Sequence, residues 1–164
     1  MSHQPVIDGL EFARTGSKLH GAWPVAGFSR LRDALRSDEG TLHYELRGVP
    51  QEQGYPALRL KVGGALHLVC QRCLGALEFP LHIDVSLGLA KTQAEIDAEP
   101  VEAEGPERIV ASPEMSVRDL VEDEVLLAMP LAPRHESCAE RQAAADAKIS
   151  PFAGLRGLVG GTRH

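Results

Sequence analysis

The sequence predicts a single α+β domain over residues 1–164, with an antiparallel sheet of about four or more strands, open or barrel-like, packed against one main helix. Three observations predict this fold. Apolar residues alternate in several segments between positions 42 and 89, and a helical pattern occupies positions 116–129. Two pairs of side chains that can bind a metal, at positions 70–73 and 135–138, lie far apart in the sequence. A chain of 164 residues is long enough to bury a core of its own.

The N-terminal third contributes few regular elements to this prediction. Residues 1–27 are rich in Gly, Pro and isolated apolar residues, so no periodic element is predicted there. Residues 29–36 have the pattern of a short helix that Ser29 can cap. Residues 42–46 alternate apolar and polar side chains, which predicts a strand, and residues 48–56 are typical of a turn region.

Three further strands are predicted before residue 90. Alternating residues on both sides of Gly63-Gly64 predict two strands joined by a hairpin or interrupted by a bulge. The clearest strand is the unbroken series of apolar residues at odd positions from Leu77 to Leu89. Pro80 lies inside that series, and proline cannot donate a ladder hydrogen bond, so a sheet edge or a bulge is predicted there.

The C-terminal half is predicted to alternate between irregular and helical segments. Residues 91–115 are acidic and interrupted by Pro and Gly, which predicts a mobile loop with a short strand near residues 108–110. Ser116 can cap the main helix, and Pro130 ends it. Residues 139–164 are predicted to be a weakly ordered tail, in which residues 151–158 have the pattern of a short helix.

The charge, the apolar content and the cysteines of the sequence exclude some classes of protein. The formal net charge is −6, and the excess acid is concentrated in residues 91–130, with eleven acidic against three basic side chains. This distribution excludes a clamp of basic residues over the whole surface, but it leaves room for a local basic face. The sequence has no apolar run near the ~20 residues of a membrane helix and no secretion signal. Three cysteines that include a C-x-x-C pair favour a reducing compartment, so we expect a cytoplasmic protein.

The cysteines and one histidine form the most informative motif. Cys70 and Cys73 are a C-x-x-C pair at the end of a predicted strand, and His135 and Cys138 form an H-x-x-C pair after the helix. If the two pairs meet, they form a tetrahedral Cys3His site of the kind that zinc prefers. Four protein ligands leave no open position, so the zinc would be structural, in a site that resembles a zinc ribbon.

Two other interpretations of the cysteines stay open. Cys70 can be a small apolar residue packed inside a strand while Cys138 is incidental in a loose segment. Alternatively, Cys70 and Cys73 can act as a dithiol redox pair. A strand follows the C-x-x-C here, whereas redox pairs of the thioredoxin type precede a helix, which counts against the redox interpretation.

Six charged residues are further candidates for contacts with a metal, RNA or a protein partner. Four of them are acids on the predicted helix and two are arginines near the cysteine pairs: Asp119, Glu122, Asp123, Glu124, Arg72 and Arg134. The acids would suit a magnesium-dependent nuclease, but they also fit a solvated helix face with acids near its positive end. Phosphoryl chemistry needs carboxylates from several elements, and no second acidic cluster is predicted, so the sequence favours the solvated face.

Several motifs resemble a known family. Residues 69–74 resemble the C-x-R-C signature of the YceD-type large ribosomal RNA accumulation proteins, and so do residues 120–135 with the following Cys138. Pro151-Phe152-Ala153 is similar to the N-P-F-A segment of that family, with Ser150 in place of Asn. The order and spacing of the motifs agree over roughly residues 10–158.

The resemblance implies a function. It implies a bacterial cytoplasmic protein that supports the synthesis, processing or stability of the 23S ribosomal RNA without being an enzyme. The partner would be 23S rRNA or its precursor, contacted directly or through a ribosomal or assembly protein, with no membrane and no small-molecule substrate. The alternatives are a metal-dependent ribonuclease that uses the acidic helix and a thiol redox protein that uses the C-x-x-C pair.

Overall fold

The computed structural model describes residues 4–100 and 105–138 and confirms the α+β class. Its main sheet has the strand order β2-β3-β4-β5-β6, antiparallel throughout except for the parallel pair β5–β6. The strands are β2 (Lys18–Pro24), β3 (Thr41–Glu52), β4 (Tyr55–Val69), β5 (Ala76–Ala90) and β6 (Glu107–Val110). A second, two-stranded sheet pairs β1 (Val6–Ile7) with β7 (Met115–Ser116).

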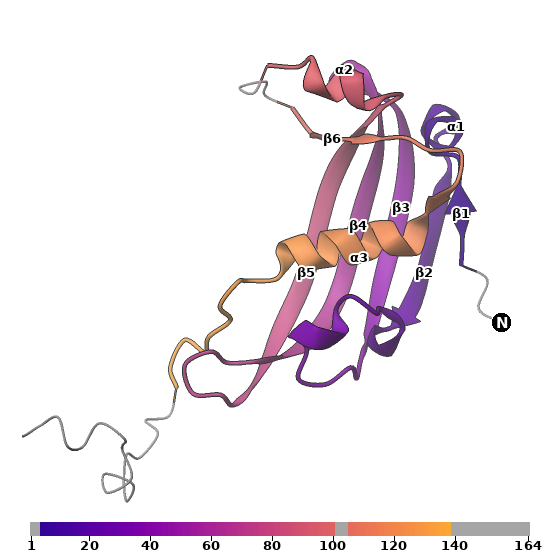
Figure 1. Ribbon diagram of the computed structural model, residues 1–164. Helices are drawn as coiled ribbons and strands as arrows, with labels where there is room; N and C mark the ends of the chain where they lie inside the picture. Colours follow the sequence, from indigo (N-terminus) through magenta and orange to yellow (C-terminus); the bar gives the residue numbers. More distant parts are fainter. Residues whose placement is uncertain (1–3, 101–104, 139–164) are drawn as a thin grey trace, which may run out of the picture.

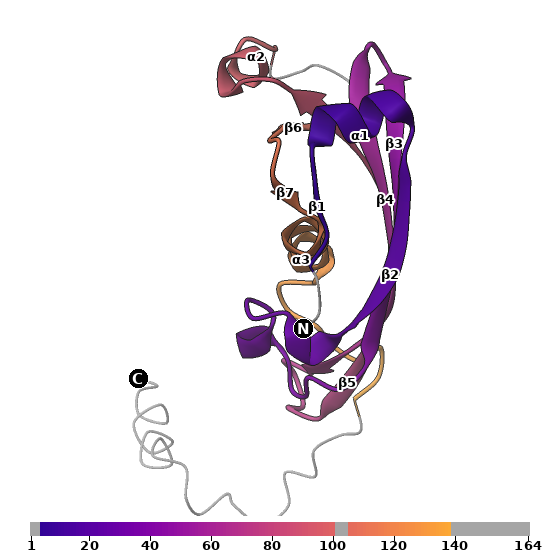
Figure 2. The same cartoon turned by 90° about the vertical axis from the view of Figure 1, so that its right-hand side faces the viewer.

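The main sheet is curved but open. Strands β2 and β6 are its two edges and do not pair with each other, so the barrel-like alternative is wrong. A barrel requires ladder hydrogen bonds around the whole circumference. Here the chain leaves the short strand β6 and crosses the concave side of the sheet as α3 (Val117–Ala128), which Figures 1 and 2 show.

The strands β3 and β4 form one long hairpin. Gln53 and Gly54 have φ angles of 51° and 95°, the left-handed values that a tight two-residue turn between twisted strands requires. The hairpin predicted at Gly63-Gly64 is wrong, because β4 continues through both glycines in unbroken register with β5. A Cβ atom on Gly64 would lie 2.7 Å from Leu42 Cδ2, so this glycine permits the close approach of β3 and does not make a turn.

The N-terminal region is more regular than predicted. It contains the helix α1 (Gly9–Thr15), which Asp8 caps by accepting a hydrogen bond from the Glu11 backbone N–H, and it contains the edge strand β2. Two single 3-10 turns follow, η1 (Val25–Gly27) and η2 (Arg32–Ala34). The helix predicted over residues 29–36 is therefore wrong in extent, since η2 covers only three residues of it.

The segment predicted as an acidic loop contains two short elements. They are the helix α2 (Gln93–Asp97), capped by Thr92, and the strand β6, which agrees with the strand predicted near residues 108–110. Pro80 lies in β5 opposite Ala65 without a register shift, at a point where β5 has only β4 as a neighbour, so the predicted sheet edge is confirmed. The tail of residues 139–164, including the helix predicted at 151–158, lies outside the described residues.

The core lies between the concave side of the sheet and α3. Ser116 begins α3 as predicted, since its side chain accepts a hydrogen bond from the Asp119 N–H at 3.2 Å. Apolar side chains of α3 are buried against fully buried residues of the sheet and of the η1–η2 segment: Val117, Val121, Val125, Phe28, Leu31, Leu46, Leu58, Leu60 and Leu87. None of the described helices has the length and apolar character of a membrane span.

Candidate metal centre

The two halves of the Cys/His motif meet at one end of the molecule. Cys70 follows β4 directly, and Cys73 lies in the connection that leads back into β5. The chain after α3 returns to this connection, where the Gln71 backbone N–H donates to the carbonyl of Pro133 at 2.8 Å. His135 and Cys138 are therefore brought beside the C-x-x-C turn, as the sequence predicted.

The C-x-x-C turn itself is closed by backbone hydrogen bonds. The Leu74 N–H donates to the Cys70 carbonyl at 2.9 Å, and the Cys70 N–H donates to the Gly75 carbonyl at 3.0 Å. Leu74 reverses the chain in the left-handed region, with φ of 60°. This tight turn places the Cys70 and Cys73 sulfurs on the same side, which is what two thiolates on one ion need.

The distances between the potential ligand atoms fit a tetrahedral zinc site. All four atoms lie within 4.8 Å of one another. Cys70 Sγ and Cys138 Sγ are 3.6 Å apart, and His135 Nδ1 is 3.4 Å from Cys73 Sγ and 3.8 Å from Cys138 Sγ. A tetrahedron with ordinary zinc–sulfur and zinc–nitrogen bonds has edges of about 3.6–3.8 Å. The four side chains therefore have the types and the spacing to hold one ion.

Two neighbouring groups orient the ligands. His135 Nε2 lies 2.8 Å from the carbonyl of Ala76, so this nitrogen donates and Nδ1 is left to face the sulfurs. The Arg72 guanidinium donates from Nε to Cys138 Sγ at 3.0 Å. The histidine is thus held in one tautomer, and one sulfur receives a charge-assisted hydrogen bond, as is common around structural zinc.

The local electrostatics favour thiolates at two of the three cysteines. The pKa of the Cys70 thiol is lowered to about 5, chiefly because the Cys73 backbone N–H donates to its sulfur. Arg72 lowers the pKa of Cys138 through its hydrogen bond. The Gly75 N–H also acts to lower the pKa of Cys73, but burial and the neighbouring sulfurs outweigh it and raise that pKa. Three sulfurs compete for negative charge here, and a dication would relieve the competition.

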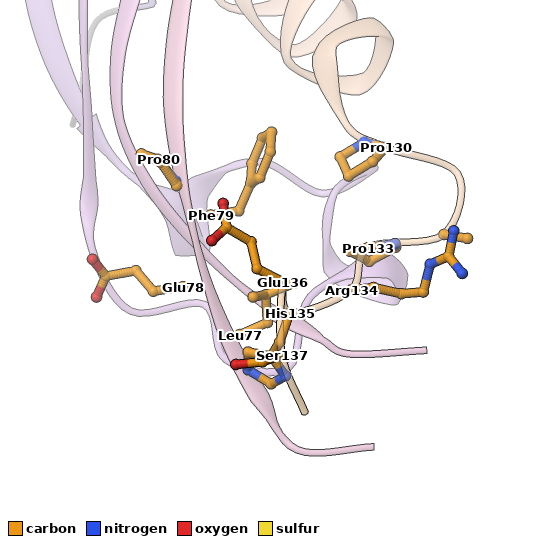
Figure 3. A pocket seen from close by; sticks show the side chains of 11 residues that line it. Leu77, Glu78, Phe79, Pro80, Pro130, Pro133, Arg134, His135, Glu136 and Ser137 are labelled. Carbon is orange, nitrogen blue, oxygen red and sulfur yellow. The ribbon is translucent and has the colours of Figure 1, made fainter. Parts of the chain in front are cut away.

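A groove lies directly beside the centre (Figure 3). It encloses about 640 Å³ and is lined by apolar residues of β5 and of the segment after α3. Phe79 and Pro80 form one wall, while Pro130, Pro133 and Arg134 form the other. Arg134 thus lies at this groove, whereas Arg72 contacts the sulfur of Cys138. The groove was not predicted, because strand alternation does not show which apolar side chains a later segment leaves uncovered.

The acids of α3 divide between two surroundings. Glu122 is buried and accepts hydrogen bonds from the Arg30 backbone N–H at 2.7 Å and from Arg30 Nε at 3.1 Å, and Asp123 also pairs with Arg30. Asp119, Asp123 and Glu124 line a second groove, of about 570 Å³, at the side of α3. The role of Arg30 was missed, since no spacing rule connects residues more than ninety positions apart.

The comparisons with known proteins give one match. A family model described as "Large ribosomal RNA subunit accumulation protein YceD" matches residues 58–159, which is well over half of the chain. The matched region begins within β4 and includes both ligand pairs. Neither the search of curated proteins nor the search of solved structures found a match.

Proposed function

The chain belongs to the family of large ribosomal RNA subunit accumulation proteins named YceD, and from this membership we propose that it is a cytoplasmic, non-catalytic factor that supports the synthesis, processing or stability of 23S rRNA. The family match is the observation that carries the proposal. The partner would be the 23S rRNA or its precursor, reached directly or through a ribosomal or assembly protein.

The second part of the proposal is a structural zinc held by Cys70, Cys73, His135 and Cys138. The measured spacing of the four ligand atoms and the donor on His135 Nε2 support it. When bound, zinc would supply two bonds to the β4–β5 connection and two to the segment after α3. Its role would be to hold these segments together, since four protein ligands leave no position for a substrate.

A non-catalytic role also suits the acids of α3. Two of the four, Glu122 and Asp123, are paired with Arg30, so they are less available to bind magnesium. A nuclease would need several unpaired carboxylates around its metal ions. Magnesium-dependent cleavage of precursor rRNA by the pure protein, lost in Asp119→Ala and Asp123→Ala, would instead support the ribonuclease alternative.

The functional proposal is tested by deleting the gene in the organism that encodes it. We expect the ratio of 23S to 16S rRNA to fall, together with the amount of free and assembled large subunit, and a plasmid copy to restore both. A deletion strain with normal 23S rRNA and normal large subunits would overturn the proposal. Pulse labelling then separates slower synthesis from faster decay.

One observation favours a second candidate, a thiol redox protein. A cysteine whose pKa is lowered to about 5 is a thiolate at neutral pH, and Cys70 Sγ lies only 3.6 Å from Cys138 Sγ. A redox role predicts a reversible disulfide with a potential in the range of cytosolic dithiols. Zinc at one ion per chain, with thiols that react only after chelation, would favour the structural metal over this candidate.

A further inference from the structure

Within residues 4–100 and 105–138, no helix covers the convex side of the main sheet, here called the outer face, along β2, β3, β4 and the first part of β5. Figure 2 shows α1 and α3 on the opposite, concave side. Because side chains alternate along a strand, the residues between the buried ones point to the outer face. Lys18, Arg47, Arg59 and Lys61 are on it, and all four are exposed.

Three of these cations form a straight row across the strands. Lys18 of β2 is directly opposite Arg47 of β3, and Arg47 is directly opposite Arg59 of β4. We call these three residues the cation row. Arg59 Nε donates to Asp84 of β5 at 3.0 Å. Within the described residues, neither Lys18 nor Arg47 forms an ion pair.

The neighbouring charges of Lys18 and Arg47 are unfavourable for the isolated protein, because Asp84 pairs only with Arg59 and, at 3.6 Å, with Lys61. Like charges directly opposite each other in a sheet repel and destabilise it. The row also stands out in a chain with a net charge of −6, in which α3, on the concave side, carries four acids and one arginine. A polyanion that bridges the three cations would turn this repulsion into attraction. The geometry therefore favours a partner with regularly spaced negative charges.

We propose that the outer face binds the phosphate backbone of helical RNA through Lys18, Arg47 and Arg59. This inference rests on the proposed function in ribosomal RNA accumulation and assigns it a contact surface. Next to the row, a shallow depression of about 190 Å³ is lined by Arg47, Arg59, Lys61 and Glu45, and it offers room for a phosphate.

The side chains of the outer face favour contacts with the phosphate backbone of RNA over contacts with its bases. Lys and Arg side chains recognise phosphates independently of sequence. Trp23 and Tyr44 stack on each other on the concave side, and Tyr55, which is in phase with Arg59 on β4, has the Arg108 guanidinium stacked over its ring at 4.0 Å. Unpaired bases bind by stacking on free aromatic rings, and the described outer face offers only the ring that Arg108 already covers, which disfavours single strands. A duplex, which presents its phosphates outward, fits better.

The test measures RNA binding by the full-length protein with zinc present. Fluorescence anisotropy with a labelled 20-base-pair RNA duplex, and with one of its strands alone, is recorded at 50 and 200 mM salt. We expect the duplex to bind more tightly, independently of its sequence. Arg47→Gln should weaken duplex binding roughly threefold to tenfold and should reduce the slope of log affinity against log salt by about 1.

The matched control is Arg32→Gln. Arg32 is an exposed arginine of η2 on the concave side, so this variant changes the net charge equally but leaves the outer face intact. We expect its affinity for the duplex to equal that of the original protein. Equal weakening by both variants would show a non-specific charge effect and overturn the assigned surface. Tighter binding of the single strand would overturn the assignment to helical RNA.

A misfolded variant is recognised by its melting temperature. Since Arg47→Gln removes repulsion within the cation row, its melting temperature should stay equal or rise. Failure of this inference is also separable from failure of the proposed function. If the original protein restores 23S rRNA in the deletion strain but does not bind duplex RNA, the function stands and the outer face is not its contact surface.

Discussion

Leu74 has a backbone conformation that most residues avoid, and it lies in the turn that carries two of the four potential zinc ligands. Its φ of 60° is in the left-handed region, which costs a residue with a side chain about 1–2 kcal/mol. The side chain is 55% exposed, so little burial compensates for this cost. The backbone conformation of Leu74 is therefore unfavourable, and other interactions of the turn must compensate for its cost.

Leu74→Gly should stabilise the protein. Glycine adopts this φ freely, but it also gains entropy in the unfolded chain, so the net rise in the free energy of unfolding should be about 0.5–1 kcal/mol. Chemical denaturation at fixed free zinc measures it. The control is Leu127→Gly, at a position in α3 that is 68% exposed, which should lose about 1 kcal/mol. A loss of stability in Leu74→Gly would show that the Leu74 side chain matters.

Glu124 is a buried carboxyl group on the groove beside α3, and within the described residues it has no hydrogen-bond partner. Burial raises its pKa, and the negative charges of Glu107 and Asp123 raise it further. A carboxyl group whose folded-state pKa is raised contributes most to stability when protonated. That contribution is complete below the unfolded value of 4.5 and is lost as the pH rises through the folded value.

Glu124→Gln should therefore raise the free energy of unfolding at pH 7 by up to about 1 kcal/mol, because it removes a charge that partial burial and the neighbouring Glu107 and Asp123 disfavour. The gain should shrink as the pH falls and should vanish near pH 4, where Glu124 is protonated in both states. Unfolding curves between pH 4 and 8 measure this. As a control, Asp119→Asn removes an exposed acid from the first turn of α3, where the helix dipole favours it, and should not stabilise. A gain independent of pH would contradict the explanation.

The sequence was most informative about single residues where chemistry restricts the choice. The four ligand candidates could be predicted because structural zinc sites are built mainly from thiolates and imidazoles, and the chain has three cysteines in all. The pairing of Arg30 with Glu122 could not be predicted, because nothing local marks either residue. The sequence led to the hypothesis that the two ligand pairs meet, and the hydrogen bond from Gln71 to Pro133 shows how the backbone brings them together.

At the scale of elements, long regular patterns were reliable and short ones were not. The strand β5 and the helix α3 agree with prediction because the periodic pattern of apolar residues repeats at least three times along each of them. One of the errors at short patterns came from glycine. The composition of Gly63-Gly64 predicts a turn, yet both glycines lie within β4. Gly64 is needed there because β3 packs so close to it that a side chain would not fit.

This interpretation of the two glycines makes opposite predictions for them. Gly64→Ala places a Cβ 2.7 Å from Leu42 Cδ2 and 2.8 Å from the Thr41 carbonyl, so we expect a loss of about 1–3 kcal/mol. Gly63→Ala is the matched control, since the nearest atom to its Cβ is 3.9 Å away, and it should be neutral or slightly stabilising. Thermal and denaturant unfolding of both variants decides. Equal losses of stability in the two variants would mean that β4 needs the backbone flexibility of glycine at both positions. The close approach of β3 to Gly64 would then not be the reason.

At the scale of the whole molecule, the sequence could not predict whether the sheet closes into a barrel or on which side acidic and basic residues gather. Alternation predicts strands, but it does not determine how many pair or whether the edges meet. The parallel pairing of β6 with β5 requires the chain to cross the end of the sheet through α2, which no local pattern indicates. The acidic character of the α3 side and the cation row on the outer face likewise emerge only when the register places distant residues together.

The proposed zinc site would join the β4–β5 connection to the segment after α3, and its loss should have a local effect. The main sheet and α3 share a large apolar core that does not involve the ligands, so it should persist without metal. The turn at residues 70–75 and the segment at 133–138 should separate. We therefore expect metal analysis to find one zinc per chain in the original protein and none in Cys73→Ser, while the circular dichroism of the fold stays nearly unchanged.

Amide hydrogen exchange locates this effect. The Gln71 N–H, which donates to Pro133 across the site, should exchange at least tenfold faster in Cys73→Ser, a change of about 1.4 kcal/mol in local stability. The Leu60 amide in the middle of β4 should exchange at its original rate. Ser137→Ala, an exposed residue between two ligands, is the control that should keep both zinc and protection. Uniformly faster exchange would show that the metal supports the whole fold, and full zinc in Cys73→Ser would remove Cys73 from the ligand set.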